Sequence, residues 1–130
     1  LSSPSDESAF GNVVSTDDGF RELVVGTWQD DYQGKRTLIL REDGSGTMVV
    51  ELSGLQATLV APRLTFNMEW SIADGRLKKH SLDGEPAAQV SMILTTMGDT
   101  VNEKILELTE ERLLLLDQDG KTKYDWRRGR

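Results

Sequence analysis

The sequence predicts an all-β protein, an antiparallel up-and-down barrel of eight to ten strands that follows a short N-terminal helical turn. Asp-Gly pairs recur at residues 43, 74, 83 and 119. Such pairs favour tight hairpin turns, because glycine adopts positive φ freely and aspartate tolerates it. Between them lie short runs rich in Val, Leu, Thr and aromatic residues, with no helices expected between strands. Hairpins in series form an antiparallel sheet, and closure into a barrel removes its exposed edges, although a β-sandwich is the alternative.

The length of 130 residues predicts one domain. Residues 1–15 are mostly small and polar, and we expect a flexible leader there, followed by a single barrel domain at 16–130. Thr16 is a suitable N-cap for about one helical turn, in which Phe20 and Leu23 lie three residues apart on one side.

The strands follow from alternating polarity, with boundaries uncertain by about 2–4 residues. The clearest is 63–73, where five apolar residues alternate with polar ones over the whole run. Segments 55–60 and 89–96 fit the pattern least well, and residues 84–100 are either a strand or a flap over the barrel mouth. The predicted strands are 24–32, 35–42, 46–53, 55–60, 63–73, 76–82, 89–96, 101–108, 112–117 and 121–128.

Composition excludes several classes of function. Lys and Arg number 15 against 22 Asp and Glu, a formal net charge of −7, so we expect no nucleic-acid partner, because an acidic chain repels phosphate backbones. No apolar run approaches the roughly 18 residues of a membrane-spanning helix. Cysteine is absent, which excludes disulfides, thiolate zinc sites and cysteine nucleophiles.

No residue pattern indicates catalysis, a metal or a cofactor. His80 is the single histidine and has no evident partners, so a small enzyme using it as acid or base is the weakest hypothesis. The segment 117–120 resembles the start of a calcium loop, but its twelfth position is Arg128 where such a loop needs Glu, and a hairpin turn explains it better. We expect the acidic run at 103–111 to be solvated. No nucleophile elbow, phosphate loop or dinucleotide fingerprint is present.

Four short motifs, in this order and spacing, resemble the small lipocalin-like domains of exported bacterial proteins. They are Gly26-Thr-Trp28, Asp43-Gly-Ser-Gly46, Trp70-Ser-Ile-Ala-Asp-Gly75 and Gly120-Lys-Thr-Lys-Tyr124. The resemblance covers roughly residues 20–128. It departs from the secreted lipocalins in its shorter length and in the absence of their disulfides.

The resemblance implies a structural role for Gly26, Trp28 and Arg128. In that family the Trp of Gly-x-Trp closes one end of the barrel under a short N-terminal helix, and an Arg of the last strand lies across its ring. Arg128 is the expected partner here, because it has the same strand parity as Trp126. We expect these residues to close the barrel rather than to bind a ligand.

The apolar residues expected to face into the barrel predict where a ligand would bind. We expect Met48, Phe66, Met68, Trp70 and Tyr124 to line an apolar cavity, since barrels of this size can hold one small ligand. The sequence thus predicts a non-enzymatic, exported protein of the periplasm or cell envelope that binds a small hydrophobic molecule. The alternative is a barrel filled by its own side chains, which binds another protein through its outer surface.

Overall fold

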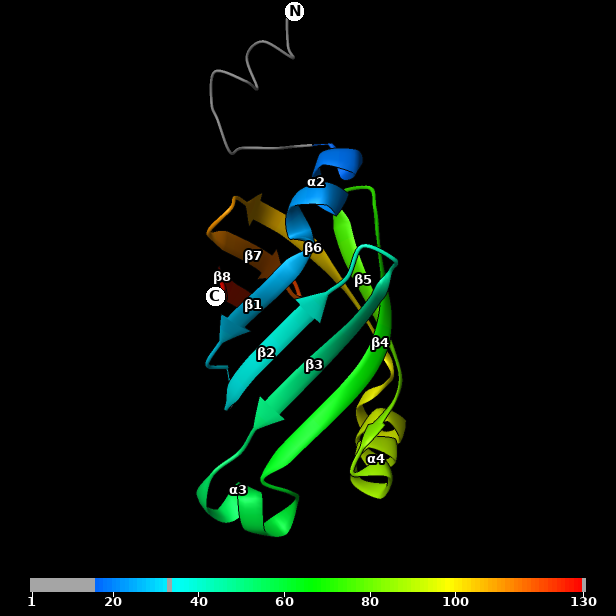
Figure 1. The fold of residues 1–130 in the computed structure, drawn as a ribbon, viewed down its shortest axis with the longest axis vertical. Coiled ribbons are helices and arrows are strands. Elements are labelled where there is room, and N and C mark those ends of the chain that lie inside the picture. Colours follow the sequence, from blue (N-terminus) through cyan, green and yellow to red (C-terminus); the bar gives the residue numbers. More distant parts are fainter. Residues whose placement is uncertain (1–15, 33, 130) are drawn as a thin grey trace, which may run out of the picture.

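The computed structural model describes residues 16–32 and 34–129, and in this part of the chain eight antiparallel strands form a closed up-and-down barrel (Figure 1). Each strand pairs with the next in sequence, and β8 returns to pair with β1. The predicted antiparallel barrel is confirmed, and the predicted leader lies outside the described residues. The strands are β1 (Gly26–Asp30), β2 (Lys35–Leu40), β3 (Ser45–Glu51), β4 (Arg63–Ala73), β5 (Arg76–Glu85), β6 (Thr100–Leu108), β7 (Arg112–Leu116) and β8 (Lys123–Arg128).

Helix α2 (Asp17–Val24) covers one end of the barrel (Figure 1). Its N-cap is Thr16, whose hydroxyl accepts a 3.0 Å hydrogen bond from the Gly19 N–H. The Asp17 carboxylate accepts hydrogen bonds from the backbone N–H groups of Gly75 and Asp74 at 2.9 and 2.8 Å. These two donors lower the pKa of Asp17 below its ordinary value and tie the helix to the β4–β5 turn.

Two predicted strands are wrong, because 55–60 and 89–96 belong to helices α3 (Gly54–Leu59) and α4 (Ala87–Met97). Figure 1 shows both helices at the end of the barrel opposite α2. In α4 the apolar residues 90, 93, 94 and 97 recur at the i, i+3, i+4, i+7 spacing of a helix, which outweighs strand propensity. A helix therefore lies at the barrel mouth, where the sequence was compatible with either a strand or a flap.

The Asp83-Gly84 pair is not a turn but lies inside β5. A Cβ at Gly84 would lie 1.9 Å from the Thr65 carbonyl oxygen and 3.0 Å from Val90 Cγ1. Glycine is therefore required here by close packing against β4 and α4, not by turn geometry.

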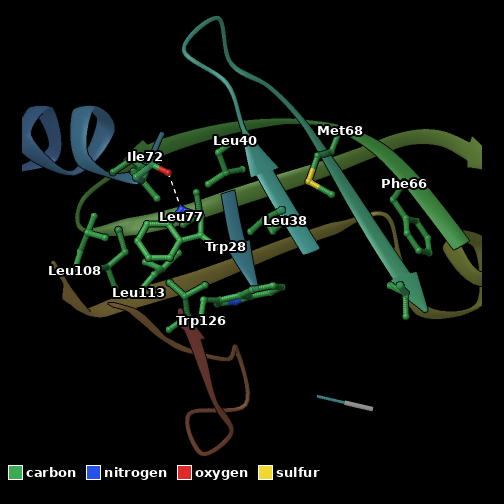
Figure 2. Packing of buried hydrophobic residues seen from close by; sticks show 14 of the residues in the cluster. Trp28, Leu38, Leu40, Phe66, Met68, Ile72, Leu77, Leu108, Leu113 and Trp126 are labelled. Carbon is green, nitrogen blue, oxygen red and sulfur yellow. Dashed lines mark hydrogen bonds between the residues drawn. The ribbon is translucent and has the colours of Figure 1, made fainter. Parts of the chain in front are cut away.

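The half of the barrel beneath α2 is packed solid by large apolar side chains (Figure 2). Phe66 and Met68 lie farther along the barrel axis, away from this packed half. Burial of these side chains supplies most of the folding free energy, at about 25 cal/mol per Å² of apolar surface removed from water. The largest fully buried members are Trp28, Trp126, Leu38, Leu40, Ile72, Leu77, Leu113 and Leu115.

Gly26, Trp28 and Arg128 meet at the packed end. The Arg128 guanidinium carbon lies 4.1 Å from the centroid of the Trp28 ring. The same guanidinium donates hydrogen bonds to the carbonyl oxygens of Leu23, Val25 and Glu110 at 2.8, 2.9 and 2.8 Å.

Gly26 leaves room for the Arg128 side chain, which braces the packed end by lying over Trp28 and donating hydrogen bonds to three carbonyls. It has φ of +138°, and a Cβ there would lie 2.4 Å from Arg128 Nη1. The Gly-x-Trp sequence therefore brings the first strand under the arginine of the last.

We predict that Arg128→Ala lowers the free energy of unfolding by about 2–3 kcal/mol, because it removes a cation–π contact and the charged donor to three carbonyls. Arg127→Ala is the matched control, since its side chain is exposed, and it should cost less than about 0.5 kcal/mol. Urea unfolding followed by circular dichroism measures both. Equal midpoints for the two variants would contradict the role of the brace.

Candidate functional site

The barrel contains a cavity of about 400 Å³ that opens at the end where α3 and α4 lie. One wall is apolar and is built by the adjacent strands β3 and β4 together with α4. In the β3–β4 register Met48 pairs with Phe66 and Gly46 with Met68, and paired residues share a face of the sheet. The apolar lining comprises Met48, Val50, Leu52, Leu64, Phe66, Met68, Ile93, Leu94, Met97 and Val101.

The structure brings together four of the five residues predicted to contact a ligand. Met48, Phe66, Met68 and Tyr124 line the cavity, whereas Trp70 does not. The Trp70 indole Nε1 donates a 2.9 Å hydrogen bond to the Arg41 carbonyl, and its backbone N–H donates to the Gly44 carbonyl at 2.8 Å. Trp70 has the expected parity but packs against the β2–β3 turn, because parity gives the face of a strand and not the depth along the barrel.

A buried ion pair forms part of the cavity floor. Lys79 Nζ lies 3.1 Å from Glu103 Oε1, and the two side chains are only 8% and 6% exposed. Lys79 Nζ also lies 5.7 Å from the centroid of the Trp126 ring. The expectation that Glu103 is solvated is wrong. The signal that could have found both residues is the period of two, since Lys79 shares the parity of buried Leu77 and Glu103 that of Ile105.

Arg36 adds a second charge pair beside the first. Its guanidinium donates to both carboxylate oxygens of Asp30, at 2.8 and 2.5 Å. Its central carbon lies 4.5 Å from the Trp126 ring centroid and 5.4 Å from that of Tyr124. The two cations of the floor are thus matched by two carboxylates, and aromatic faces cover the positive groups.

Tyr124 closes the polar side of the cavity. Its hydroxyl donates a 3.1 Å hydrogen bond to Asp117 Oδ1, and its ring meets the Tyr32 ring edge-on at 4.9 Å. Burial first, and then the Asp117 carboxylate, raise the pKa of Tyr124 well above its ordinary value. The phenol therefore remains a neutral hydrogen-bonding group at physiological pH.

His80 lies outside the cavity, on the outer face of β5. Its Nδ1 is 3.5 Å from Glu69 Oε1, and its Nε2 is 3.4 Å from Asp99 Oδ2. These three residues do not form a metal site, and no group of three or more His, Asp or Glu in 16–32 and 34–129 is arranged to hold a metal ion. In the same ranges, no helix is both long and apolar enough to cross a membrane.

The ion pair can be tested by a mutant cycle. We predict that Lys79→Met lowers the free energy of unfolding by about 3 kcal/mol, because it leaves the Glu103 carboxylate buried without a counter-charge. The double variant Lys79→Met/Glu103→Leu should recover most of that loss, since it removes both charges. Urea unfolding measures each variant, and a double variant no more stable than Lys79→Met would disprove the coupling.

No protein-family model matches the chain, and no curated protein matches it. Its fold is similar to the crystal structure of a lipocalin-like protein from Bacteroides uniformis, with a TM-score of 0.58 and 18% sequence identity. The match covers 82% of this chain and 99% of that one. Together with the closed eight-strand antiparallel barrel and its short N-terminal helix, this match shows that the fold of the chain is lipocalin-like.

Proposed function

We propose that this protein is a non-enzymatic binding protein that holds a small, largely apolar molecule in the open half of its barrel. The cavity beside Met48, Phe66 and Met68 carries the proposal. Its volume of about 400 Å³ falls within the range of roughly 300–1,000 Å³ that small-molecule sites occupy. The lipocalin-like fold also supports ligand binding in the barrel, since barrels of this size can enclose one ligand.

The chemistry of the wall favours an apolar ligand of loosely defined shape. Met48, Met68 and Met97 all line the cavity, and methionine adapts to irregular partners because it is unbranched and polarizable. The opposite half of the barrel is packed, so a ligand enters from the end that carries α3 and α4. We place the protein in the periplasm or cell envelope, a proposal that rests on the motifs resembling those of exported lipocalin-like domains.

A second candidate is an interaction module that binds another protein through its outer surface. Large apolar side chains are exposed on α3, on α4 and late in β5, and exposed apolar side chains that gather into a patch mark protein interfaces. They are Leu55 at 72%, Leu59 at 72%, Leu82 at 54%, Met92 at 61% and Met97 at 81% exposed. The first candidate requires an empty cavity that a ligand can enter, whereas the second does not use the cavity.

We predict that the neutral fluorescent dye phenylnaphthylamine binds the wild-type protein saturably. Met48→Trp should weaken its binding by about tenfold, equivalent to about 1.4 kcal/mol, because the indole fills the cavity. Met92→Trp is the matched control, since Met92 is exposed on α4 and does not line the cavity. Dye titration measures all three proteins.

Equal affinity of both variants would show that the dye binds elsewhere. If the wild-type protein takes up no dye, the cavity is not a ligand site, and the interaction module becomes the better account.

A further inference from the structure

We propose that the cavity selects a neutral amphiphile whose head group both donates and accepts hydrogen bonds, such as an alcohol or a primary amide, over a fatty acid or an alkylamine. This inference rests on the proposed function and names the ligand class of the same cavity. It comes from the Lys79–Glu103 pair, which lies where the hollow half of the barrel meets the packed half at Trp126.

Both members of the pair have unused hydrogen-bonding capacity. Glu103 Oε1 is buried and receives no hydrogen bond from any described residue, so its 3.1 Å contact with Lys79 is an ion pair without hydrogen-bond geometry. An ammonium group carries three donors, and within 16–32 and 34–129 the single polar partner of Lys79 is Glu103. Buried polar groups normally find partners, so the floor presents both a free acceptor and free donors to the cavity.

A head group that is donor and acceptor at once fits both needs. A hydroxyl or a carboxamide can donate to Glu103 Oε1 and accept from Lys79 Nζ. A carboxylate accepts only, and therefore leaves Glu103 unsatisfied. An alkylammonium donates only, and therefore leaves the Lys79 donors unused.

The charge balance of the floor leads to the same conclusion. At the floor Lys79 is balanced by Glu103, and Arg36 is balanced by the bidentate contact with Asp30. The other two carboxylates of the lining lie elsewhere: Asp117 accepts a hydrogen bond from the Tyr124 hydroxyl, and Asp99 lies beside His80. A charged head group would add an uncompensated charge to a site where both ions are more than nine-tenths buried, and burial of an unpaired charge is strongly unfavourable. The phenol of Tyr124, which also lines the cavity, is kept neutral by burial and by Asp117.

The apolar wall then accommodates the tail. Phe66 and Met68 lie away from the packed half of the barrel (Figure 2), and they share the cavity lining with Lys79 and with Ile93 and Leu94 of α4. An alkyl chain against this wall removes apolar surface from water on both sides.

The test compares one tail with four head groups on the wild-type protein. Dodecanol, dodecanamide, dodecanoate and dodecylamine each compete with phenylnaphthylamine at neutral pH. We expect the alcohol and the amide to displace the dye at concentrations at least about tenfold lower than the acid and the amine. If dodecanoate or dodecylamine competes equally well or better, or if none of the four competes with bound dye, the head-group inference is overturned while the proposed function stands. If the dye itself does not bind, both fail.

Charge variants provide the second arm. Glu103→Gln leaves Lys79 without its counter-charge, so dodecanoate should gain at least about tenfold relative to dodecanol. Glu107→Gln, on the same strand but exposed beside Arg112, is the control and should leave the ratio unchanged. An unchanged ratio in Glu103→Gln would place the head group elsewhere and overturn the inference. If that variant does not fold, the wild-type series decides alone.

Discussion

The barrel depends on one short seam. Strands β1 and β8 pair over just two described positions, Trp28 with Arg128 and Gln29 with Arg127, so the ladder that closes the sheet is its weakest. The Arg128 side chain reinforces that seam by covering the Trp28 ring and by holding carbonyls of Leu23, Val25 and Glu110. Closure, the seating of α2 and the β6–β7 corner thus share a single guanidinium, and the packed end forms beneath it.

Dense packing at the α2 end of the barrel explains how the opposite end can contain a cavity. Apolar burial beneath α2 supplies the stability, so the open half need not be filled by side chains. The Lys79–Glu103 pair lies at the boundary between these halves. A buried ion pair is seldom more stabilising than apolar residues of similar volume. The stability of the fold therefore does not account for the Lys79–Glu103 pair. Its position in the cavity lining is instead what the proposed role in head-group recognition requires.

The sequence was most informative where residues alternate without interruption. The strand predicted at 63–73 has those bounds in the structure, because its apolar face is continuous. The sequence was least informative where the position of a side chain depends on its depth along the barrel as well as on the face of its strand. Trp70 has the inward parity and lies outside the cavity. Glu103 and Lys79 also have the inward parity, and only their charge suggests the surface, yet they are buried in the cavity lining. Depth along the barrel depends on how eight strands are staggered, and a local pattern does not contain that information.

Helix α4 shows why the mouth was harder to predict than the packed end. The helical spacing of its apolar residues 90, 93, 94 and 97 was present in the sequence, but it spans only about two turns, and a short apolar run of that length also fits a buried strand. Val90 is 1% exposed and rests on Gly84, whereas Met97 at the other end is 81% exposed. One side-chain hydrogen bond, from Gln89 Nε2 to the Val60 carbonyl at 3.5 Å, links α4 to the end of α3 among the described residues. The helix is therefore held mainly by apolar packing, through Val90 in the core and through Ile93 and Leu94 against it. Apolar packing thus seats α4 over the mouth of the cavity, where the proposed ligand would enter.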